Sequence, residues 1–107
     1  SHPLAAATAI DMLKAGGNAV DAAIAGAVLL GFCEPQMTGL GGDCFVLLKP
    51  PGEDRVLGLN GSGRAPAGLS AAAMRDRGLT AVPEQGIEAV TVPGAVDAWC
   101  ALLDRFG

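Results

Sequence analysis

The sequence is poor in residue types on which many common binding sites depend. Its single histidine, His2, has no second histidine with which to form a metal cluster or proton relay. Aromatic residues make up 4% of the chain and tyrosine is absent, which disfavours a platform on which nucleic-acid bases stack. Seven basic against eleven acidic residues give a net charge of -4, which argues against a phosphate-neutralising surface. We therefore expect no metal, no cofactor and no nucleic acid.

Long apolar runs and paired cysteines are also missing. The longest uncharged apolar run covers residues 22–33, whereas a bilayer span needs roughly 20 residues. No basic stretch precedes it, so no signal peptide is predicted. Cys33, Cys44 and Cys100 follow neither a CxxC nor a zinc-finger spacing, and we expect them to be buried free thiols.

Half of the chain is hydrophobic and sixteen residues are glycine, so 107 residues can form one small domain with a limited core. Pro3 is suited to the first turn of a helix that we predict over residues 3–15. Apolar residues recur every three positions in this segment, and Gly16-Gly17 ends it. Asn18 is suited to cap a second helix that Glu34-Pro35 ends. Residues 22–32 carry no charge on any face, which predicts neighbours on several sides of this helix.

The remainder of the chain predicts a hairpin and short helices. Residues 44–48 and 56–59 are expected to pair across a turn at 50–54, and the first of these strands is expected to be covered on both faces. A short helix capped by Ser70, a strand over 88–92 and a last helix over 95–105 follow. The fold class is therefore α+β, with helices on an antiparallel sheet. Two strands alone are not stable, so the hairpin needs partner strands from elsewhere.

Two glycine-rich loops are candidates for a site. Residues 38–42 join a helix to a strand, the reverse of the order in phosphate-binding loops, and are expected to serve close backbone packing. Residues 60–66 follow the hairpin, where the chain leaves the sheet. Within them, Arg64 could hold a carboxylate by two parallel hydrogen bonds and Ser62 could donate one more; a solvated arginine on a turn is the alternative.

No complete active site is visible in the sequence. The threonines and serines, Thr91 and Ser62 among them, have no histidine nearby except His2, and no carboxylate pair stands out for acid–base work. No threonine is N-terminal, where its own amine could act as the base.

Several blocks in order nevertheless resemble the γ-glutamyltranspeptidase family. The resemblance covers nearly the whole chain, and the block GGNAVDAA at 16–23 is its most specific part. The other blocks are SHPLA at 1–5, EP at 34–35, TGLGG at 38–42, AP at 65–66, VPGAV at 92–96, Trp99 and FG at 106–107.

The resemblance implies an N-terminal nucleophile (Ntn) hydrolase with a four-layer αββα sandwich, made by self-cleavage of a precursor into a large and a small subunit. The N-terminal threonine of the small subunit would attack a γ-glutamyl amide, as in glutathione-type substrates. Residues 1–107 would be a single incomplete domain, the N-terminal portion of the large subunit, with no catalytic residue and no activity of its own. Its partners would be the rest of the large subunit, the small subunit and a small amide substrate.

Two positions depart from the family pattern. Ser62 stands where the family carries an arginine that binds the substrate α-carboxylate, and Arg64 lies two positions later, on the same face if the chain is extended. Asp43 replaces a glycine, with no partner evident for its carboxylate. An Ntn acylase acting on another amide and a non-catalytic packing module therefore stay open as alternatives. The localisation stays open too, since family members are often exported while the cysteines weakly favour a reducing compartment.

Overall fold

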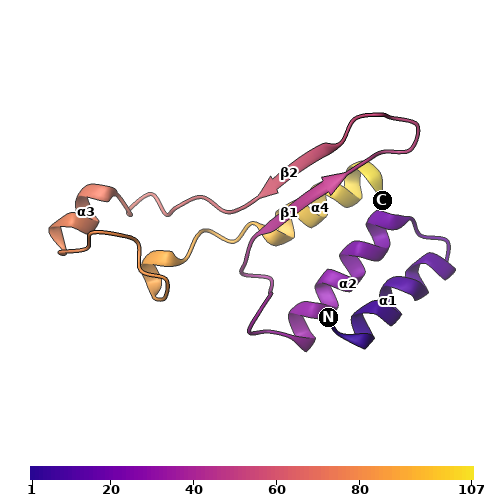
Figure 1. Cartoon of the computed structure of the whole chain (residues 1–107), viewed down its shortest axis with the longest axis horizontal. Helices are drawn as coiled ribbons and strands as arrows, with labels where there is room; N and C mark the ends of the chain where they lie inside the picture. The colour runs from indigo at the N-terminus through magenta and orange to yellow at the C-terminus, as the bar shows by residue number, and fades with distance from the viewer.

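The computed structural model describes all 107 residues, from Ser1 to Gly107, as three long helices and a two-stranded hairpin, with a projecting arm (Figure 1). As expected, this is an α+β arrangement with helices on one face of an antiparallel sheet. The elements in chain order are α1 (Pro3–Lys14), α2 (Ala19–Cys33), β1 (Cys44–Leu48), β2 (Leu57–Gly61), α3 (Ala71–Asp76), the 3₁₀ turn η1 (Ile87–Ala89) and α4 (Ala95–Phe106).

The turn between α1 and α2 forms as its residues predict. Gly16 has a φ of 98°, and the amides of Gly16 and Gly17 donate to the carbonyls of Leu13 and Met12, which is a Schellman ending. Asn18 Oδ1 then accepts the amides at the start of α2, while the Asn18 amide donates to Asp21 Oδ2 at 2.8 Å. This capping box satisfies amide groups that the helix itself leaves unpaired.

Small residues set the contact between α1 and α2. A methyl group added to Gly26 would lie 3.5 Å from the carbonyl oxygen of Ala5 and 3.7 Å from Cβ of Ala9, so the two helices approach closely. Ala5 is the buried residue of α1. The larger apolar residues of α1 are exposed, although the three-residue periodicity had suggested an apolar face. They are Leu4, Ile10, Met12 and Leu13.

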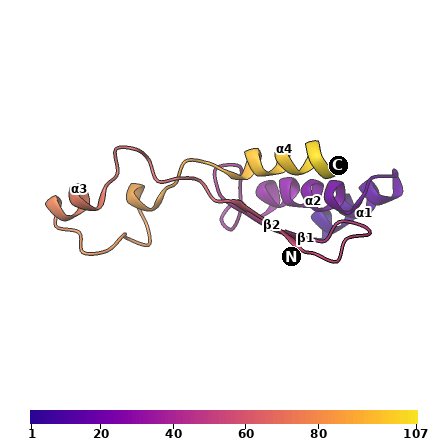
Figure 2. The same cartoon turned by 90° about the horizontal axis from the view of Figure 1, so that it is seen from above.

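The core lies between the hairpin and the helices α2 and α4. β1 pairs with β2 in a register that places Val46 opposite Leu59. Both pack against a buried cluster made of Ile24, Ala95, Trp99 and Leu102. Figure 2 shows α4 and α2 on one side of the hairpin only. On the other face Phe45 is 70% exposed and Leu47 is 83% exposed. Within this chain, helices therefore cover one face of β1, whereas the sequence predicts a strand that is covered on both faces.

Residues 62–93 project away from this body and return to it (Figures 1 and 2). The arm carries α3, which Ser70 Oγ caps through the Ala73 amide at 3.1 Å, and the turn η1. The strand predicted over 88–92 is wrong. Gly86 adopts a φ of 118° and starts the 3₁₀ turn, and beyond it a single backbone bond, from the Val92 amide to the Arg64 carbonyl, joins the two limbs.

The cysteines are free, but their burial differs from the expectation. Cys33 and Cys44 are partly buried and Cys100 is exposed. The buried positions of α4 are 95, 98, 99 and 102, which form one stripe along the helix, and residue 100 lies off that stripe. None of the helices has both the length and the apolar character needed to cross a bilayer.

Candidate substrate-binding site

Three chain segments meet at the end of the hairpin opposite its turn. We call this meeting of residues 42–43, 61–64 and 91–95 the glycine junction. The carbonyl of Gly42 accepts the amides of Gly94 at 3.2 Å and Ala95 at 3.0 Å, so it caps α4, which has no side-chain cap. The Val92 amide donates to the Arg64 carbonyl at 2.9 Å. Close backbone packing is thus the role of the end of the 38–42 loop, as its order in the chain suggested.

Glycine is required in the junction because there is no room for side chains. A Cβ added to Gly61 would lie 2.5 Å from Cβ of Ala98, and one added to Gly94 would lie 2.4 Å from the Gly61 carbonyl oxygen. One added to Gly63 would lie 1.4 Å from the Val92 carbonyl oxygen. The segments that enter and leave the arm are therefore in backbone contact.

The carboxylate of Asp43 has the partners that the sequence did not reveal. Its Oδ1 accepts the Gly63 amide at 3.1 Å and the Thr91 hydroxyl at 3.2 Å. These donors lie 20 and 48 positions away in the chain. In the sequence Thr91 stands out only as a hydroxyl that could be a nucleophile, and nothing there places it beside Asp43. The one available signal was an acidic residue within a glycine-rich loop, which demands a local donor.

Ser62 and Arg64, the two predicted site residues, lie on the exposed edge of the junction. Gly61 and Gly63 are partly buried and alternate with them, so the loop directs its glycines inward and both of these side chains outward. The Ser62 amide donates to Asn60 Oδ1 at 3.0 Å, and Ser62 Oγ lies 3.5 Å from the Gly63 carbonyl oxygen. The Arg64 guanidinium belongs to none of the three ion pairs of the chain. Arg64 and Ser62 thus flank one glycine on the exposed edge, where the Ser62 hydroxyl makes one long bond to the Gly63 carbonyl and the Arg64 guanidinium has no ion-pair partner.

The groups that acid–base chemistry would need lie elsewhere. His2 caps α1, where its Nδ1 accepts the Leu4 amide at 3.2 Å. No three histidine, cysteine, aspartate or glutamate side chains cluster as metal ligands would. In the arm, the backbone amide of Glu88 and then the side chain of Arg77 lower the pKa of Glu88 by hydrogen bonding. Glu88 therefore contributes to the shape of the arm.

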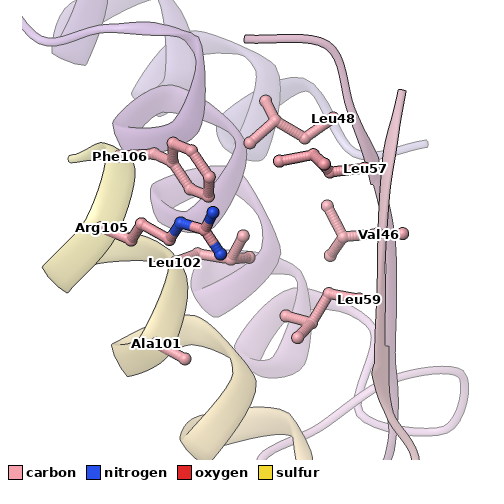
Figure 3. A pocket seen from close by; sticks show the side chains of 9 residues that line it. Val46, Leu48, Leu57, Leu59, Ala101, Leu102, Arg105 and Phe106 are labelled. Atoms are coloured by element: carbon pink, nitrogen blue, oxygen red, sulfur yellow. The ribbon is translucent and has the colours of Figure 1, made fainter. Parts of the chain in front are cut away.

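An apolar cavity of about 160 Å³ lies at the other end of the hairpin, between the strands and the last turns of α4 (Figure 3). Arg105 is the only charged residue on its wall, and its guanidinium packs over the ring of Phe106 at 4.9 Å. With no other titratable group to act on a ligand, the cavity offers no chemistry. The glycine junction is the better candidate site.

Comparison with known proteins covers almost the whole chain. A family model described as Gamma-glutamyltranspeptidase matches residues 5–107. The Glutathione hydrolase-like YwrD proenzyme of Bacillus subtilis is 43% identical over 99% of the chain and 20% of the relative. The Oxamate amidohydrolase proenzyme of Klebsiella pneumoniae is 36% identical over 95% of the chain and 19% of the relative.

Solved structures agree with this likeness. The crystal structure of Helicobacter pylori gamma-glutamyltranspeptidase superposes with a TM-score of 0.89 at 30% identity, over 100% of this chain and 31% of that one. The chain thus spans about one fifth of the length of the curated relatives that it matches. The helices and hairpin described above are consistent with a piece of the Ntn-hydrolase fold of these proteins.

Proposed function

Because this chain belongs to the γ-glutamyltranspeptidase family, we propose that residues 1–107 are the N-terminal portion of the large subunit of an autoprocessed enzyme that cleaves γ-glutamyl amide bonds. The family relatives are named as proenzymes of hydrolases. The threonine nucleophile and its oxyanion donors are assigned to the remainder of the protein. On this proposal the chain is an incomplete domain, inactive alone, that supplies part of the substrate site.

One observation carries the assignment of the site: the alternation of inward glycines with outward Ser62 and Arg64 at the junction. A guanidinium presents paired donors that match the two oxygens of a carboxylate. The Ser62 hydroxyl can donate to one of those oxygens from the same edge. The proposed role of this edge is to hold the α-carboxylate of a γ-glutamyl group, while a threonine from the small subunit attacks the amide.

The proposed partners follow from the open face of the hairpin. Phe45 and Leu47 are exposed apolar side chains on strands that cannot be stable as an isolated pair. Strands from the rest of the large subunit and from the small subunit would cover this face and complete the αββα sandwich. The glutathione-type substrate would then bind at the sheet end where the glycine junction lies.

The test uses the protein expressed from the complete gene. We expect it to cleave itself into two subunits and to hydrolyse γ-glutamyl-p-nitroanilide. Arg64→Ala should raise KM for this substrate with little change in kcat, because a carboxylate contact remote from the reacting bond is made equally in ground and transition states. Arg75→Ala is the matched control, since Arg75 lies in α3 and is absent from the junction. An unchanged KM in Arg64→Ala would make Arg64 a solvated bystander.

A second candidate is an Ntn acylase acting on a different amide, and Ser62 is the observation that favours it. The family resemblance implies an arginine at this position, and a family relative is named for hydrolysis of oxamate. On this reading the wild-type enzyme cleaves γ-glutamyl-p-nitroanilide slowly and Ser62→Arg accelerates it. Rapid cleavage by the wild type would show that serine at position 62 does not lower the rate with this substrate. A protein that neither cleaves itself nor hydrolyses any amide would instead be a non-catalytic packing module.

A further inference from the structure

We infer that Asp43 is a positioning residue that holds the loop carrying Ser62 and Arg64 in the conformation in which both face the substrate. The inference rests on the proposed function, because it takes these two side chains as carboxylate ligands. It adds a residue that touches neither the substrate nor the reacting atoms. Asp43 acts through the backbone of Gly63, which lies between the two ligands in the chain.

The geometry fixes the orientation of one peptide group. The Gly63 amide donates to Asp43 Oδ1 at 3.1 Å, and this amide belongs to the planar unit that joins Ser62 to Gly63. Any rotation of that unit would redirect the backbone on both sides of it. The next anchor along the loop is the Arg64 carbonyl, which accepts the Val92 amide at 2.9 Å. Arg64 is therefore held between two backbone anchors, one of which is Asp43.

The carboxylate itself is held from a third segment. The Thr91 hydroxyl donates to the same Oδ1 at 3.2 Å, so one oxygen receives donors from both limbs of the arm. Asp43 takes part in none of the three ion pairs of the chain. Hydrogen bonds to an ionised acceptor are stronger than neutral ones, which suits a single atom that ties two limbs together.

The loop needs such a restraint because of its composition. Gly63, which follows the end of β2, has wide conformational freedom as a residue, and Ser62 and Arg64 are exposed. Without an acceptor at position 43, the Gly63 amide would have no partner here. The glycine that the family resemblance implies at this position has no side chain to supply one. The two departures from the family pattern are therefore connected in this inference. The acceptor at position 43 holds the loop that carries the arginine at position 64.

The test compares Asp43→Ala with Asp43→Asn in the protein expressed from the complete gene. Alanine removes the acceptor, and we expect KM for γ-glutamyl-p-nitroanilide to rise about tenfold, equivalent to about 1.4 kcal/mol, with kcat within about twofold. Asparagine keeps an oxygen at Oδ1, and its KM should stay within about threefold of the wild type. Thr91→Val should fall between the two. Asp11→Ala, in an exposed pair with Lys14 on α1, is the control and should leave KM unchanged.

Hydrogen exchange of the segment 61–64 supplies a readout that does not need catalysis. Asp43→Ala should speed this exchange, and Asp43→Asn should restore most of the protection. Unchanged KM and exchange in Asp43→Ala would overturn the inference, as would a loss of kcat and thermal stability without a change in KM. If the wild-type protein hydrolyses no substrate, the proposed function fails. The exchange comparison on the same samples then decides by itself whether Asp43 holds the loop.

Discussion

Gly63→Ala should disrupt the glycine junction more than any other single methyl group added to the chain. Its Cβ would lie 1.4 Å from the carbonyl oxygen and 2.6 Å from the carbonyl carbon of Val92. Both are backbone atoms, which cannot rotate away as a flexible side chain would. Gly63 has a negative φ, which alanine adopts without backbone strain. The expected effect therefore comes from the steric clash alone.

The size of the effect follows from what must move. Carbon and oxygen atoms in contact need about 3.5 Å, so the two limbs of the arm must separate by about 2 Å. That displacement breaks the bond from the Val92 amide to the Arg64 carbonyl and weakens the bond from Gly63 to Asp43. Overpacking costs about 1–3 kcal/mol, and bonds of these two kinds contribute about 0.5–3 kcal/mol each. We expect a loss of at least about 2 kcal/mol in the free energy of unfolding, which is the sum of the lower ends of these ranges.

Thermal melting of the protein expressed from the complete gene measures this loss. A drop in Tm of a few degrees is expected, since each kcal/mol lowers the Tm of a 150–250-residue protein by about 2–4 °C and that of a longer one by less. Gly41→Ala is the matched control, because a Cβ there meets nothing within 4 Å and the φ of Gly41 is not positive. If Gly63→Ala melts with the wild type and the control, the close approach of the two limbs is refuted.

Three further predictions concern other parts of the chain. Asn18→Ala should cost about 1–2 kcal/mol in a thermal melt, because it removes the α2 cap and the bond from Asn18 Nδ2 to the Phe106 carbonyl; Asn18→Asp, which keeps the cap, should cost less. Trp99→Ala should lower stability by about 3–5 kcal/mol in the same assay, since this ring lies in the core, and Trp99→Phe should be milder. The Glu88 carboxyl should titrate below 4.5 in a carboxyl-carbon NMR experiment, and Arg77→Ala should move the midpoint part of the way back, because the backbone hydrogen bond remains. A pKa lowered by folding means that the stabilisation is present above pH 4.5 and is lost as the pH falls through the folded-state value.

The local structure of this chain could be predicted because neighbouring residues determine it. The Gly16-Gly17 ending, the Asn18 cap and the Ser70 cap each depend on donors and acceptors within five positions. The hairpin was found from its apolar runs, although β2 lies one to two residues later than predicted. The bounds of a strand depend on its partner, and here Gly61 joins the ladder because it faces Cys44.

The candidate site was only half predictable, for a physical reason. Ser62 and Arg64 can be proposed from the sequence because their loop follows a strand and carries hydrogen-bond donors, and their role in binding stays a prediction. The partners of Asp43 could not be found, since the bonds to Gly63 and Thr91 bridge 20 and 48 positions. The strand predicted at 88–92 is wrong for the same reason, because contacts with distant parts of the chain decide the conformation there. Its alternation was weak, and tertiary contacts at the junction leave only Val92 paired with the opposite limb.

The junction and the open face of the hairpin are energetically linked. Asp43 immediately precedes β1 and Ser62 immediately follows β2, so fraying of this strand pair would separate Asp43 from the loop that its carboxylate bonds. Burying Phe45 and Leu47 would stabilise the pair by about 1.5–3 kcal/mol for each side chain. On the proposed assembly, the subunits that cover this face therefore also order the carboxylate-binding edge. The site residues of this chain would then reach their binding geometry only when the sheet that carries them is covered.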